Sequence, residues 1–290
     1  MDADKEQKAL KRIELAHSWS MKYCDSPIVF LDSGGKDSAV IVELAKRSGL
    51  PFKVVHNHTT ADAPETVRFV RKKFKQMEQD GIDCAISYPI MSMWELIPHK
   101  RMPPTRLSRY CCSVLKESYQ PRAFAATGVR WAESANRSNN RGAYEELASS
   151  IKNKVILNND NDASRQWFDV CALKRKHIVN PIIDWTDRDV WDFIADAKIE
   201  VNPLYGDCGF GRVGCIGCPM AAKHRYQQFA RWPKYEQLYR HAFQRMLDEI
   251  NARGLETKLW NNADDVWHWW MEDGILPGQM ELELEQEDDD

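Results

Sequence analysis

The sequence contains no stretch of the roughly 18–20 uninterrupted apolar residues that a membrane helix needs. It also lacks an apolar leader, because its first residues, MDADKEQKALKRIEL, are charged from the second position onward. We therefore expect no membrane partner and a location in the cytoplasm. Thiols stay reduced there, so the eight cysteines are expected to be metal ligands, reactive thiols or buried structural thiols rather than disulfides.

The sequence also lacks a large excess of charge of one sign, since its net charge is −3. This small net charge is the sum of an acidic region and a basic region. Residues 281–290, ELELEQEDDD, include seven acids and no base, and we expect the tail 280–290 to be disordered. Residues 100–141 instead include nine Lys or Arg against two Glu. Such a basic concentration is typical of a solvated face or of a surface that binds polyphosphate or nucleic acid, and the sequence leaves both open.

Strand and helix patterns alternate along the first two thirds of the chain. Apolar runs bounded by turn residues predict strands at 27–32, 52–58, 84–90, 126–131 and 177–183. Periodic segments predict helices at 37–49, at 64–81 and around 109–125, and a capping-box pattern after 185 predicts another. This alternation is typical of an α/β fold with an open, mostly parallel, doubly wound sheet. Residues 138–172, rich in Asn, Asp and Ser, predict a loop-rich insertion.

Two glycines and a lysine follow the first predicted strand, in the segment SGGKDS at 33–38. In an open parallel sheet, ligands bind at the carboxyl ends of strands, where this segment lies. Glycines let backbone N–H groups approach a phosphate, and the helix that follows adds its partial positive charge. Lys36 can neutralise a phosphate, and Asp37 can hold Mg²⁺ or cap the helix. The segment is not a Walker A loop, because Phe30 and Asp37 stand where that loop needs Gly and Ser or Thr.

The SGGKDS segment resembles the pyrophosphate-binding loop (PP-loop) of the N-type ATP pyrophosphatases, which belong to the adenine nucleotide alpha-hydrolase-like superfamily. Further segments resemble, in the same order, parts of the phosphoadenosine-phosphosulfate reductase family, whose members include sulfate-activating reductases and sulfurtransferase-like and phage-type proteins. The resemblance covers roughly residues 27–220. The matching segments are HNHTTADAPET (56–66), YCCSVLKES (110–118), TGVRWAESANR (127–137), NPIIDWTDRDVW (180–191) and RVGCIGCP (212–219).

The resemblance implies roles for three groups of residues. Phosphate binding is implied for Ser33, Gly34, Gly35, Lys36, Asp37 and Ser38. Contacts with the adenine or ribose are implied for the end of the second strand, at His58, Thr59 and Thr60. Further nucleotide contacts are implied for Gly128, Arg130, Glu133, Ser134 and Arg137. The catalytic candidates among them are Lys36, Asp37, Arg130 and Arg137, and a salt bridge to Glu133 is the alternative for the two arginines.

Five cysteines have the spacing of a metal site. Cys215 and Cys218 form a C-x-x-C turn, which directs two thiolates at one point and suits a tetrahedral zinc or an iron–sulfur cluster. Cys208 and the pair Cys111–Cys112 can complete the site. The resemblance implies a [4Fe–4S] cluster, with zinc or a metal-free thiol pair as alternatives. We favour Cys112, Cys208, Cys215 and Cys218 as ligands, with Cys111 as an alternative ligand.

The sequence departs from the family's reductases in one respect. Those enzymes use a nucleophilic cysteine near the C-terminus, whereas here no cysteine follows Cys218. We therefore expect an enzyme that binds ATP or an adenylyl sulfate-type nucleotide, with Mg²⁺, and cleaves the α–β phosphate bond to adenylate an acceptor in sulfur transfer. A sulfonucleotide reductase that releases sulfite, and a non-catalytic nucleotide-binding or redox-sensing subunit, are the alternatives. A nucleic acid, a sulfur-donor protein or a second copy of the chain stay open as partners.

These expectations divide the chain into four parts. They are an N-terminal helix (1–26), a PP-loop domain (27–220) with the insertion 138–172 and the cysteine cluster 208–218, a helical C-terminal extension (221–279) and the acidic tail (280–290).

Overall fold

The computed structural model describes residues 3–116, 122–147, 155–157, 176–206, 209–255 and 259–272. The chain forms two compact units. Unit 1 combines Met1–Pro89 with Lys116–Gly214, and unit 2 combines Ile90–Leu115 with Cys215–Asp290. The chain therefore enters unit 2 twice. Within the described ranges, every helix is too short or too polar to pass through a membrane.

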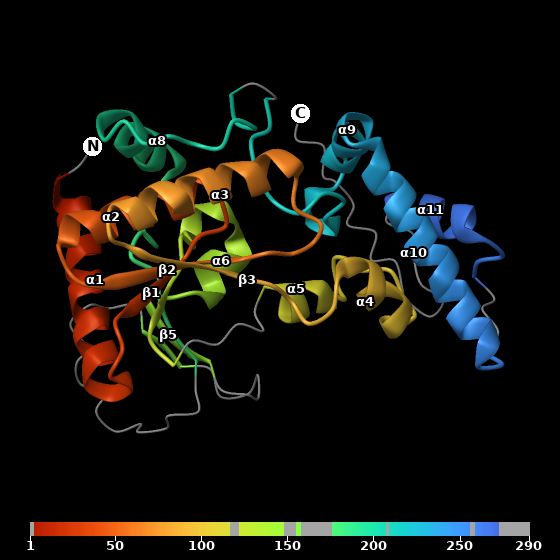
Figure 1. Cartoon of the computed structure of the whole chain (residues 1–290), viewed down its shortest axis with the longest axis horizontal. Helices are drawn as coiled ribbons and strands as arrows, with labels where there is room; N and C mark the ends of the chain where they lie inside the picture. The colour runs from red at the N-terminus through yellow and green to blue at the C-terminus, as the bar shows by residue number, and fades with distance from the viewer. Residues whose placement is uncertain are drawn as a thin grey trace, which may run out of the picture. The chain divides into compact units, whose positions relative to one another are not determined.

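Unit 1 is a sheet with helices packed against it (Figure 1). Its strands are β1 (Ile28–Leu31), β2 (Phe52–Asn57), β3 (Asp83–Ser87), β4 (Ala125–Ala126), β5 (Tyr144–Leu147), β6 (Val155–Leu157) and β7 (Lys176–Val179). Its helices are α1 (Ala3–Cys24), α2 (Lys36–Ser48), α3 (Pro64–Gln79), α6 (Ala135–Asn140) and α8 (Asp187–Asp196), with a 3-10 turn η1 at Trp131–Glu133.

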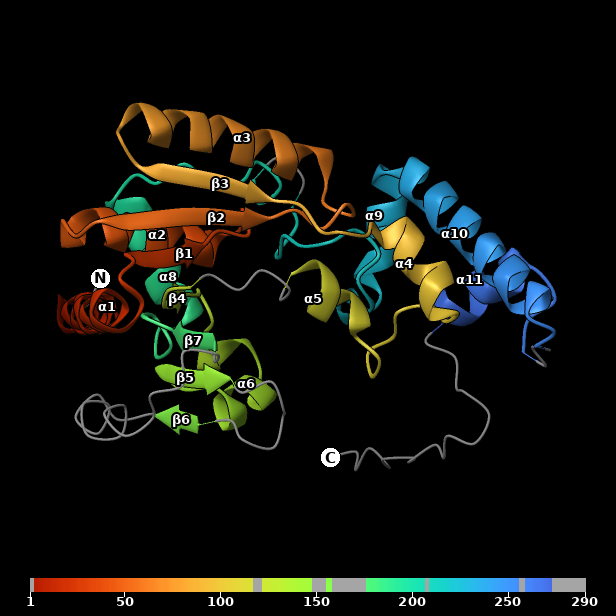
Figure 2. The same ribbon diagram turned by 60° about the horizontal axis from the view of Figure 1, so that its bottom comes forward.

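The strand order is β3-β2-β1-β4-β7-β5-β6. Strands β3, β2, β1, β4 and β7 run parallel to one another, whereas β5 is antiparallel to both of its neighbours, β7 and β6. Figure 2 shows β5 and β6 next to β7 at one edge of the sheet. The chain builds from β1 outward to β3, then returns to the other side of β1 with β4. This doubly wound order confirms the α/β class and places a topological switch point between β1 and β4.

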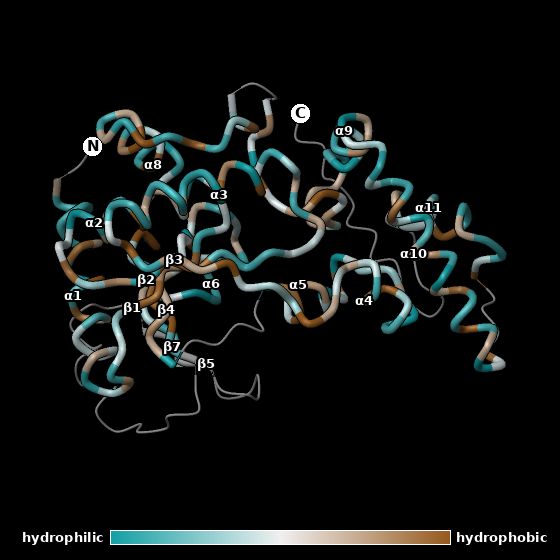
Figure 3. The backbone as a smooth tube through the Cα atoms, in the orientation of Figure 1, coloured by the Kyte–Doolittle hydropathy of each residue, from teal (hydrophilic) through white to brown (hydrophobic). Residues whose placement is uncertain are grey.

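The main core of unit 1 lies on one face of β1. Ile28 and Phe30 are fully buried there, together with apolar side chains of α1, α2, α3 and α8. Burial of each such side chain contributes about 1.5–3 kcal/mol. Val29, on the opposite face, belongs to a much smaller cluster with Val55 and Ala123. Figure 3 shows the resulting concentration of hydrophobic residues along the central strands. The core fixes β1 and α2, and with them the loop that joins the two.

Three elements differ from the sequence-based expectation. The helix expected around 109–125 ends early, as α5 (Tyr110–Leu115), and Ala125–Ala126 is already strand β4. The strand expected at 126–131 is only these two residues long, because the chain leaves the sheet at Gly128 to pack against α2. The insertion expected to be loop-rich contributes strands β5 and β6 to the sheet. Most of the rest of 138–172 lies outside the described residues.

Unit 2 is helical. It consists of α4 (Met93–Lys100), α5, a 3-10 turn η4 (Pro219–Ala221), α9 (His224–Arg231), α10 (Pro233–Ala252) and α11 (Ala263–Met271). Figure 2 shows α10 packed between α4 and α11. The core of this unit is aromatic: Tyr239 donates its hydroxyl hydrogen to the Ile216 carbonyl at 2.9 Å, and the Trp270 indole donates to the Pro104 carbonyl at 2.7 Å. The sequence analysis predicted no helix at α4.

Candidate functional site

The SGGKDS segment is the tight loop between β1 and α2, at the switch point of the sheet. The carboxylate of Asp32, which is buried, holds this loop from one side. Its Oδ1 accepts hydrogen bonds from the Gly34 N–H and the Ser38 hydroxyl, both at 2.8 Å. Its Oδ2 accepts from Lys73 Nζ at 2.7 Å. The sequence analysis missed Asp32 and Lys73 because this anchor forms only when α3 packs beside the loop.

The first turn of α2 directs backbone donors toward the loop. Gly35 is the N-cap residue and provides no side-chain cap. The Lys36 N–H instead donates to the Tyr205 hydroxyl at 3.1 Å, and the Gly35 N–H donates to Ser33 Oγ at 3.4 Å. A helix N-terminus whose N–H groups are reached only by hydroxyls is a ready site for an anion, because phosphate oxygens accept the same hydrogen bonds.

Two cations and two carboxylates meet beside this loop. Lys36 Nζ lies 2.9 Å from Asp187 Oδ1 and 3.4 Å from Asp37 Oδ2. Arg130 donates from Nε to Asp37 at 2.7 Å and from Nη2 to Asp187 at 3.0 Å. Arg130 is buried, and its Nη1 donates to the Trp185 carbonyl at 3.3 Å, so its position is fixed. The sequence analysis named all of these ionic groups except Asp187, whose place in the first turn of α8 followed from the capping pattern it did identify.

Two glycines allow the backbone segments of the site to approach each other. At Gly34, with φ of +74°, an added Cβ would lie 3.0 Å from side-chain carbons of Thr66 and of Val70. At Gly128, an added Cβ would lie 2.8 Å from the carbonyl carbon of Asp37. Gly128, which the resemblance assigned to nucleotide contact, therefore presses the end of β4 onto the start of α2. This contact brings Arg130 to Asp37.

The expected site residues after Arg130 form a connected turn. Glu133 accepts from the Arg130 N–H at 3.1 Å and forms an ion pair with Arg137. Ser134 caps α6 by accepting from the Arg137 N–H at 3.2 Å. The salt bridge to Glu133, the alternative for both arginines, is thus present for Arg137. Arg130 is paired with Asp37 and Asp187 instead.

The third expected group, His58, Thr59 and Thr60, follows β2 directly, and β2 pairs with β1. The residues that the resemblance assigned to the nucleotide therefore lie after β1, β2 and β4. These strands are parallel neighbours, so their carboxyl ends meet at one edge of the sheet. The structure brings these three segments together at that edge.

Several pKa values are shifted at this edge. Burial raises the pKa of Asp32, but Lys73 and the Gly34 and Ser38 hydrogen bonds outweigh it, so the pKa of Asp32 lies below its ordinary value. The hydrogen bond from Lys36 and the charges of Lys36 and Arg130 lower the pKa of Asp187 against a smaller effect of burial. Both carboxyl groups are therefore anions at neutral pH.

The described cysteines of the expected metal site gather in unit 2. Cys111 and Cys112 lie on α5, and Cys215 and Cys218 flank a turn in which the Cys218 N–H donates to the Cys215 carbonyl at 3.3 Å. The hydrogen bond to Cys112, burial, and the nearby Cys112, Cys215 and Cys218 thiols all raise the pKa of Cys111. Cys111 and Cys112 on one chain segment therefore lie near enough to Cys215 and Cys218 on the other for their charges to interact. Cys208 lies outside the described residues.

The spacing of these thiols bears on the kind of metal. In a tetrahedral zinc site with Zn–S bonds of about 2.3 Å, neighbouring sulfurs lie roughly 3.8 Å apart. Among the described residues, no three of these cysteine sulfurs lie within 4.8 Å of one another. A four-iron cluster needs wider spacing, because each thiolate binds its own iron. The described sulfur positions therefore lack the close spacing of a tetrahedral zinc site.

The turn at Cys215–Cys218 is held in place by packing and by a hydrogen bond at Gly217. Gly217 has a φ of +73°, and a Cβ added there would lie within 3.0 Å of ring atoms of Phe229, Tyr239 and Trp270. Its N–H donates to Gln228 Oε1 at 2.8 Å. The aromatic core of unit 2 therefore sets where both cysteines of the C-x-x-C turn lie.

The comparison with protein-family models shows to which family this chain belongs. The model of the phosphoadenosine phosphosulfate reductase domain matches residues 27–221, which include the loop and the C-x-x-C turn. The chain belongs to this family. The sequence-based resemblance, which ran from 27 to 220, is thereby confirmed.

Three curated relatives are similar to this family member. The uncharacterized protein MJ0973 of Methanocaldococcus jannaschii is 27% identical, over 82% of this chain and 50% of the relative, so the chain spans half its length. The adenosine 5'-phosphosulfate reductase of Allochromatium vinosum is 25% identical, over 67% of this chain and 68% of the relative. Subunit 2 of the sulfate adenylyltransferase of Saccharophagus degradans is 29% identical, over 62% and 60%. The family and these relatives support a nucleotide-binding enzyme of sulfur metabolism.

Proposed function

We propose that the protein binds ATP at the loop between β1 and α2, cleaves its α–β phosphate bond and transfers the adenylyl group to an acceptor in a sulfur-transfer reaction. The observation that carries this proposal is the pair of cations, Lys36 and Arg130, held beside the backbone N–H donors of the α2 N-terminus. A relative that is a sulfate adenylyltransferase subunit adds support, since that enzyme's name describes adenylyl transfer.

Binding would begin with an exchange of partners at the loop. The Lys36 N–H, now bonded to the Tyr205 hydroxyl, would donate to an oxygen of the β- or γ-phosphate. Lys36 Nζ would turn from Asp187, whose side chain is 64% exposed, to the same phosphates. The released carboxylates of Asp37 and Asp187 would then be free to hold the Mg²⁺ that accompanies ATP, because Mg²⁺ prefers carboxylate and phosphate oxygens.

The chemical step would be an in-line displacement at the α-phosphorus. An oxygen of the acceptor forms a bond to that phosphorus while the bond to the oxygen bridging to the β-phosphorus breaks, and pyrophosphate leaves with the electron pair. Negative charge then grows on the pyrophosphate, where the loop N–H groups and Lys36 are already placed. A sulfur nucleophile next displaces AMP from the adenylated acceptor, so that sulfur is bonded to the acceptor and AMP is released.

The cysteines of unit 2 would hold a [4Fe–4S] cluster, which supplies electron-transfer chemistry when each of its irons carries one cysteine thiolate. We propose Cys111, Cys112, Cys215 and Cys218 as the ligand set, because these four are the described thiols that affect one another electrostatically, whereas Cys208 lies outside the described residues. The aromatic core under Gly217 would keep the C-x-x-C turn in place when the cluster binds.

The test is to follow ATP labelled at the α-phosphorus, with hydrosulfide as the sulfur source and mixed RNA and mixed DNA as acceptors. We expect AMP and pyrophosphate in equal amounts. Lys36→Ala should lower this activity by 100-fold or more, since it removes a charge that acts on the leaving group. Lys46→Ala removes an exposed lysine from the last turn of the same helix and should leave the activity unchanged.

Two outcomes would contradict the proposal. Release of ADP and phosphate would show cleavage at the β–γ bond. Tight binding of ATP without turnover, with the cluster fully loaded and every acceptor supplied, would favour the non-catalytic alternative.

A second candidate is a sulfonucleotide reductase, favoured by the adenosine 5'-phosphosulfate reductase among the relatives. This reaction would transfer the sulfonate sulfur to a thiolate and release the nucleotide, and a second thiol would then release sulfite as a disulfide forms. Sulfite release from adenylyl sulfate or phosphoadenylyl sulfate with added thiol would support it. Unchanged sulfite release in a variant with both Cys111→Ser and Cys112→Ser would show that those thiols take no part.

A further inference from the structure

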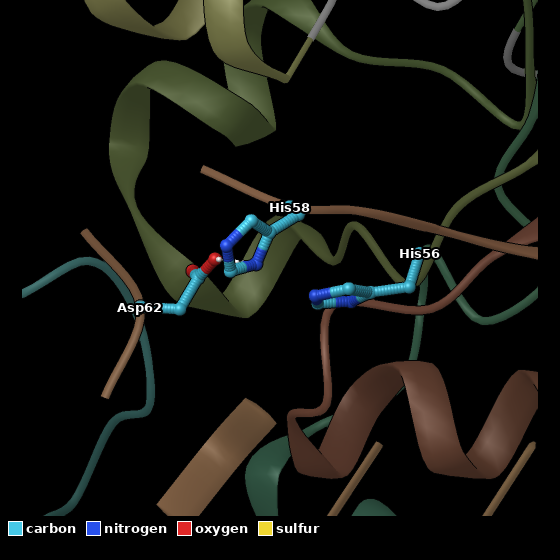
Figure 4. Close-up of side chains that lie close together, drawn as sticks. All are labelled: His56, His58 and Asp62. Carbon is cyan, nitrogen blue, oxygen red and sulfur yellow. Dashed lines mark ion pairs between the residues drawn. The ribbon is translucent and has the colours of Figure 1, made fainter. Parts of the chain in front are cut away.

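A second group of metal-ligating side chains lies at the end of β2, apart from the cysteines. His56, His58 and Asp62 place one ligand atom each within 4.8 Å of one another. Figure 4 shows the rings of both histidines and the Asp62 carboxylate converging on one region. Among the described residues it is the only group of three or more His, Cys, Asp or Glu ligand atoms this close together.

A hydrogen bond to a backbone carbonyl fixes the tautomer of His56 that can bind a metal ion. Its Nδ1 lies 2.8 Å from the carbonyl oxygen of Asp32. A carbonyl oxygen only accepts, so Nδ1 carries the hydrogen and Nε2 carries the lone pair. A backbone carbonyl that fixes the tautomer in this way is the usual outer partner of a metal-binding histidine.

The lone pair of His56 Nε2 is left without a hydrogen-bond partner among the residues that the structure describes. His56 is only 3% exposed, so water does not replace that partner freely. A buried acceptor without a partner costs about 1–3 kcal/mol. A ligand that accepts this lone pair removes that cost, and a metal ion is such a ligand.

The other two residues come from the turn after β2. His58 Nδ1 lies 3.3 Å from Asp62 Oδ2, and the Asp62 carboxylate also accepts from the Thr59 N–H at 2.7 Å. Thr60 takes a left-handed conformation, with φ of +62°, which turns the chain back so that Asp62 returns to His58. The turn thus delivers a carboxylate, itself nine-tenths buried, to two imidazoles.

We propose that His56, His58 and Asp62 bind one divalent transition-metal ion of the zinc class. Two imidazoles and one carboxylate suit Zn²⁺, Co²⁺, Ni²⁺ or Fe²⁺, whereas Mg²⁺ prefers oxygen ligands alone. Bonds of about 2.0–2.2 Å bring neighbouring ligand atoms to roughly 3.3–3.5 Å, and His58 Nδ1 and Asp62 Oδ2 already lie 3.3 Å apart. Three protein ligands leave a coordination position for water or for an oxygen of a bound ligand.

This site goes beyond the proposed adenylation, which uses Mg²⁺ at Asp37 and Asp187. The two are joined through one residue: the Asp32 carbonyl holds His56, and the Asp32 carboxylate holds the Gly34 N–H. A metal ion at His56 would therefore stiffen the loop that faces the phosphates.

The test uses the anaerobically purified protein with its iron–sulfur cluster loaded, so that the cysteines are occupied. Co²⁺ is titrated in, without nucleotide, and followed by visible absorption and by metal analysis. We expect one Co²⁺ per chain, with d–d bands and no new thiolate-to-cobalt charge-transfer band. His58→Ala and Asp62→Asn should each weaken Co²⁺ binding by about 100-fold or more, since even outer partners of metal ligands are worth 10–100-fold.

His241→Ala, which removes an exposed histidine of α10, is the matched control and should bind Co²⁺ like the unchanged protein. Circular dichroism and the thermal midpoint show that each variant is folded, and Asp62→Asn keeps an oxygen that accepts from Thr59. Zn²⁺ should compete at stoichiometric amounts, and millimolar Mg²⁺ should not.

Absence of this binding in the unchanged protein would overturn the proposal. So would a Co²⁺ affinity that both folded variants leave intact, or a spectrum dominated by thiolate charge transfer. Because no nucleotide is present, these results are independent of whether the protein cleaves ATP.

Discussion

Gly128 shows how a single missing side chain places a charge. Its Cα faces the Asp37 backbone so closely that a Cβ would lie 2.8 Å from the carbonyl carbon and 2.9 Å from the oxygen. Backbone atoms cannot rotate away, so any larger residue must push α2 and β4 apart. The ion pair between Arg130 and Asp37, at 2.7 Å, depends on that approach.

We therefore expect Gly128→Ala to weaken ATP binding by about 10-fold and to destabilise unit 1 by about 1–3 kcal/mol, as overpacking does. Calorimetric titration with ATP and Mg²⁺ measures the first effect, and hydrogen exchange of the α2 amides the second. Gly206→Ala is the control, because a Cβ there meets no described atom within 4 Å. Equal affinities of the two variants would show that Gly128 does not position Arg130.

Asp32 predicts a pH dependence. Its pKa is lower in the folded protein than the unfolded value of about 3.9, so its stabilising effect is complete above that value and is lost as the pH falls through the folded pKa. Asp32→Asn should remove this acid sensitivity of α2 below about pH 4. At pH 7 it should cost about 2–3 kcal/mol, less than for a fully buried pair because Lys73 is 18% exposed.

The measurement is hydrogen exchange of the α2 amides from pH 7 downward, corrected for the intrinsic rate. Asp80→Asn, which removes an exposed acid at the end of α3, is the control and should keep the slope of the unchanged protein. An unaltered slope in Asp32→Asn would mean that another carboxyl group carries the acid sensitivity.

At the scale of elements, an acidic residue in the first turn of α8 forms an ion pair with a lysine in the first turn of α2. Asp187, in the first turn of α8, neutralises both Lys36 and Arg130. A polyphosphate must compete with it for those cations when no Mg²⁺ is present. Asp187 is the exposed partner in both pairs, at 64%, and solvent screening limits such pairs to about 0.2–1 kcal/mol, so Asp187→Asn should tighten Mg²⁺-free pyrophosphate binding by up to about fivefold.

Calorimetry with pyrophosphate and a chelator checks this prediction. Asp192→Asn, on the same helix and paired only with Arg188 among the interactions that the structure describes for it, is the control. Weaker binding in Asp187→Asn would show that Asp187 orders Arg130 rather than competing with the ligand. With Mg²⁺ present we expect the opposite sign, since the carboxylate would then hold the metal.

The elements also show what sequence could and could not foresee. The start of α2 was predictable because SGG and a periodic apolar run mark it locally, and the α8 capping box was confirmed with Thr186 and Asp189. By contrast, β4 was predicted too long, because its end is set by contact with α2 rather than by its own residues. Helix α4 is short and contains Pro98, which obscures its pattern.

The site residues divide in the same way, into those marked by a local sequence pattern and those whose role depends on tertiary packing. Lys36, Asp37 and Arg130 lie in segments with a recognisable local pattern, and sequence reasoning named them. Asp32 and Tyr205 have no such pattern, since their roles arise only where the loop meets α3 and the segment after α8.

At the scale of the whole molecule, the cysteine cluster joins two distant segments of unit 2. We expect anaerobically purified protein to be brown and to contain about four irons per chain, as four cysteine ligands imply. Cys111→Ser and Cys215→Ser should each lose most of the iron, and Cys208→Ser should keep it. Iron analysis and the visible spectrum measure this, and full iron in Cys111→Ser with loss in Cys208→Ser would restore the set favoured from sequence.

The division of unit 2 between Ile90–Leu115 and the residues from Cys215 onward has a consequence for biosynthesis. Helices α4 and α5 are synthesised about 140–150 residues before α10, which packs against α4, is complete. At roughly 5–20 residues per second, that interval lasts about 7–30 seconds, during which the apolar face of α4 has not yet been buried by α10. Exposed apolar surface of this kind favours binding by a chaperone, and the proposed metal site can form only after Cys218 has been translated.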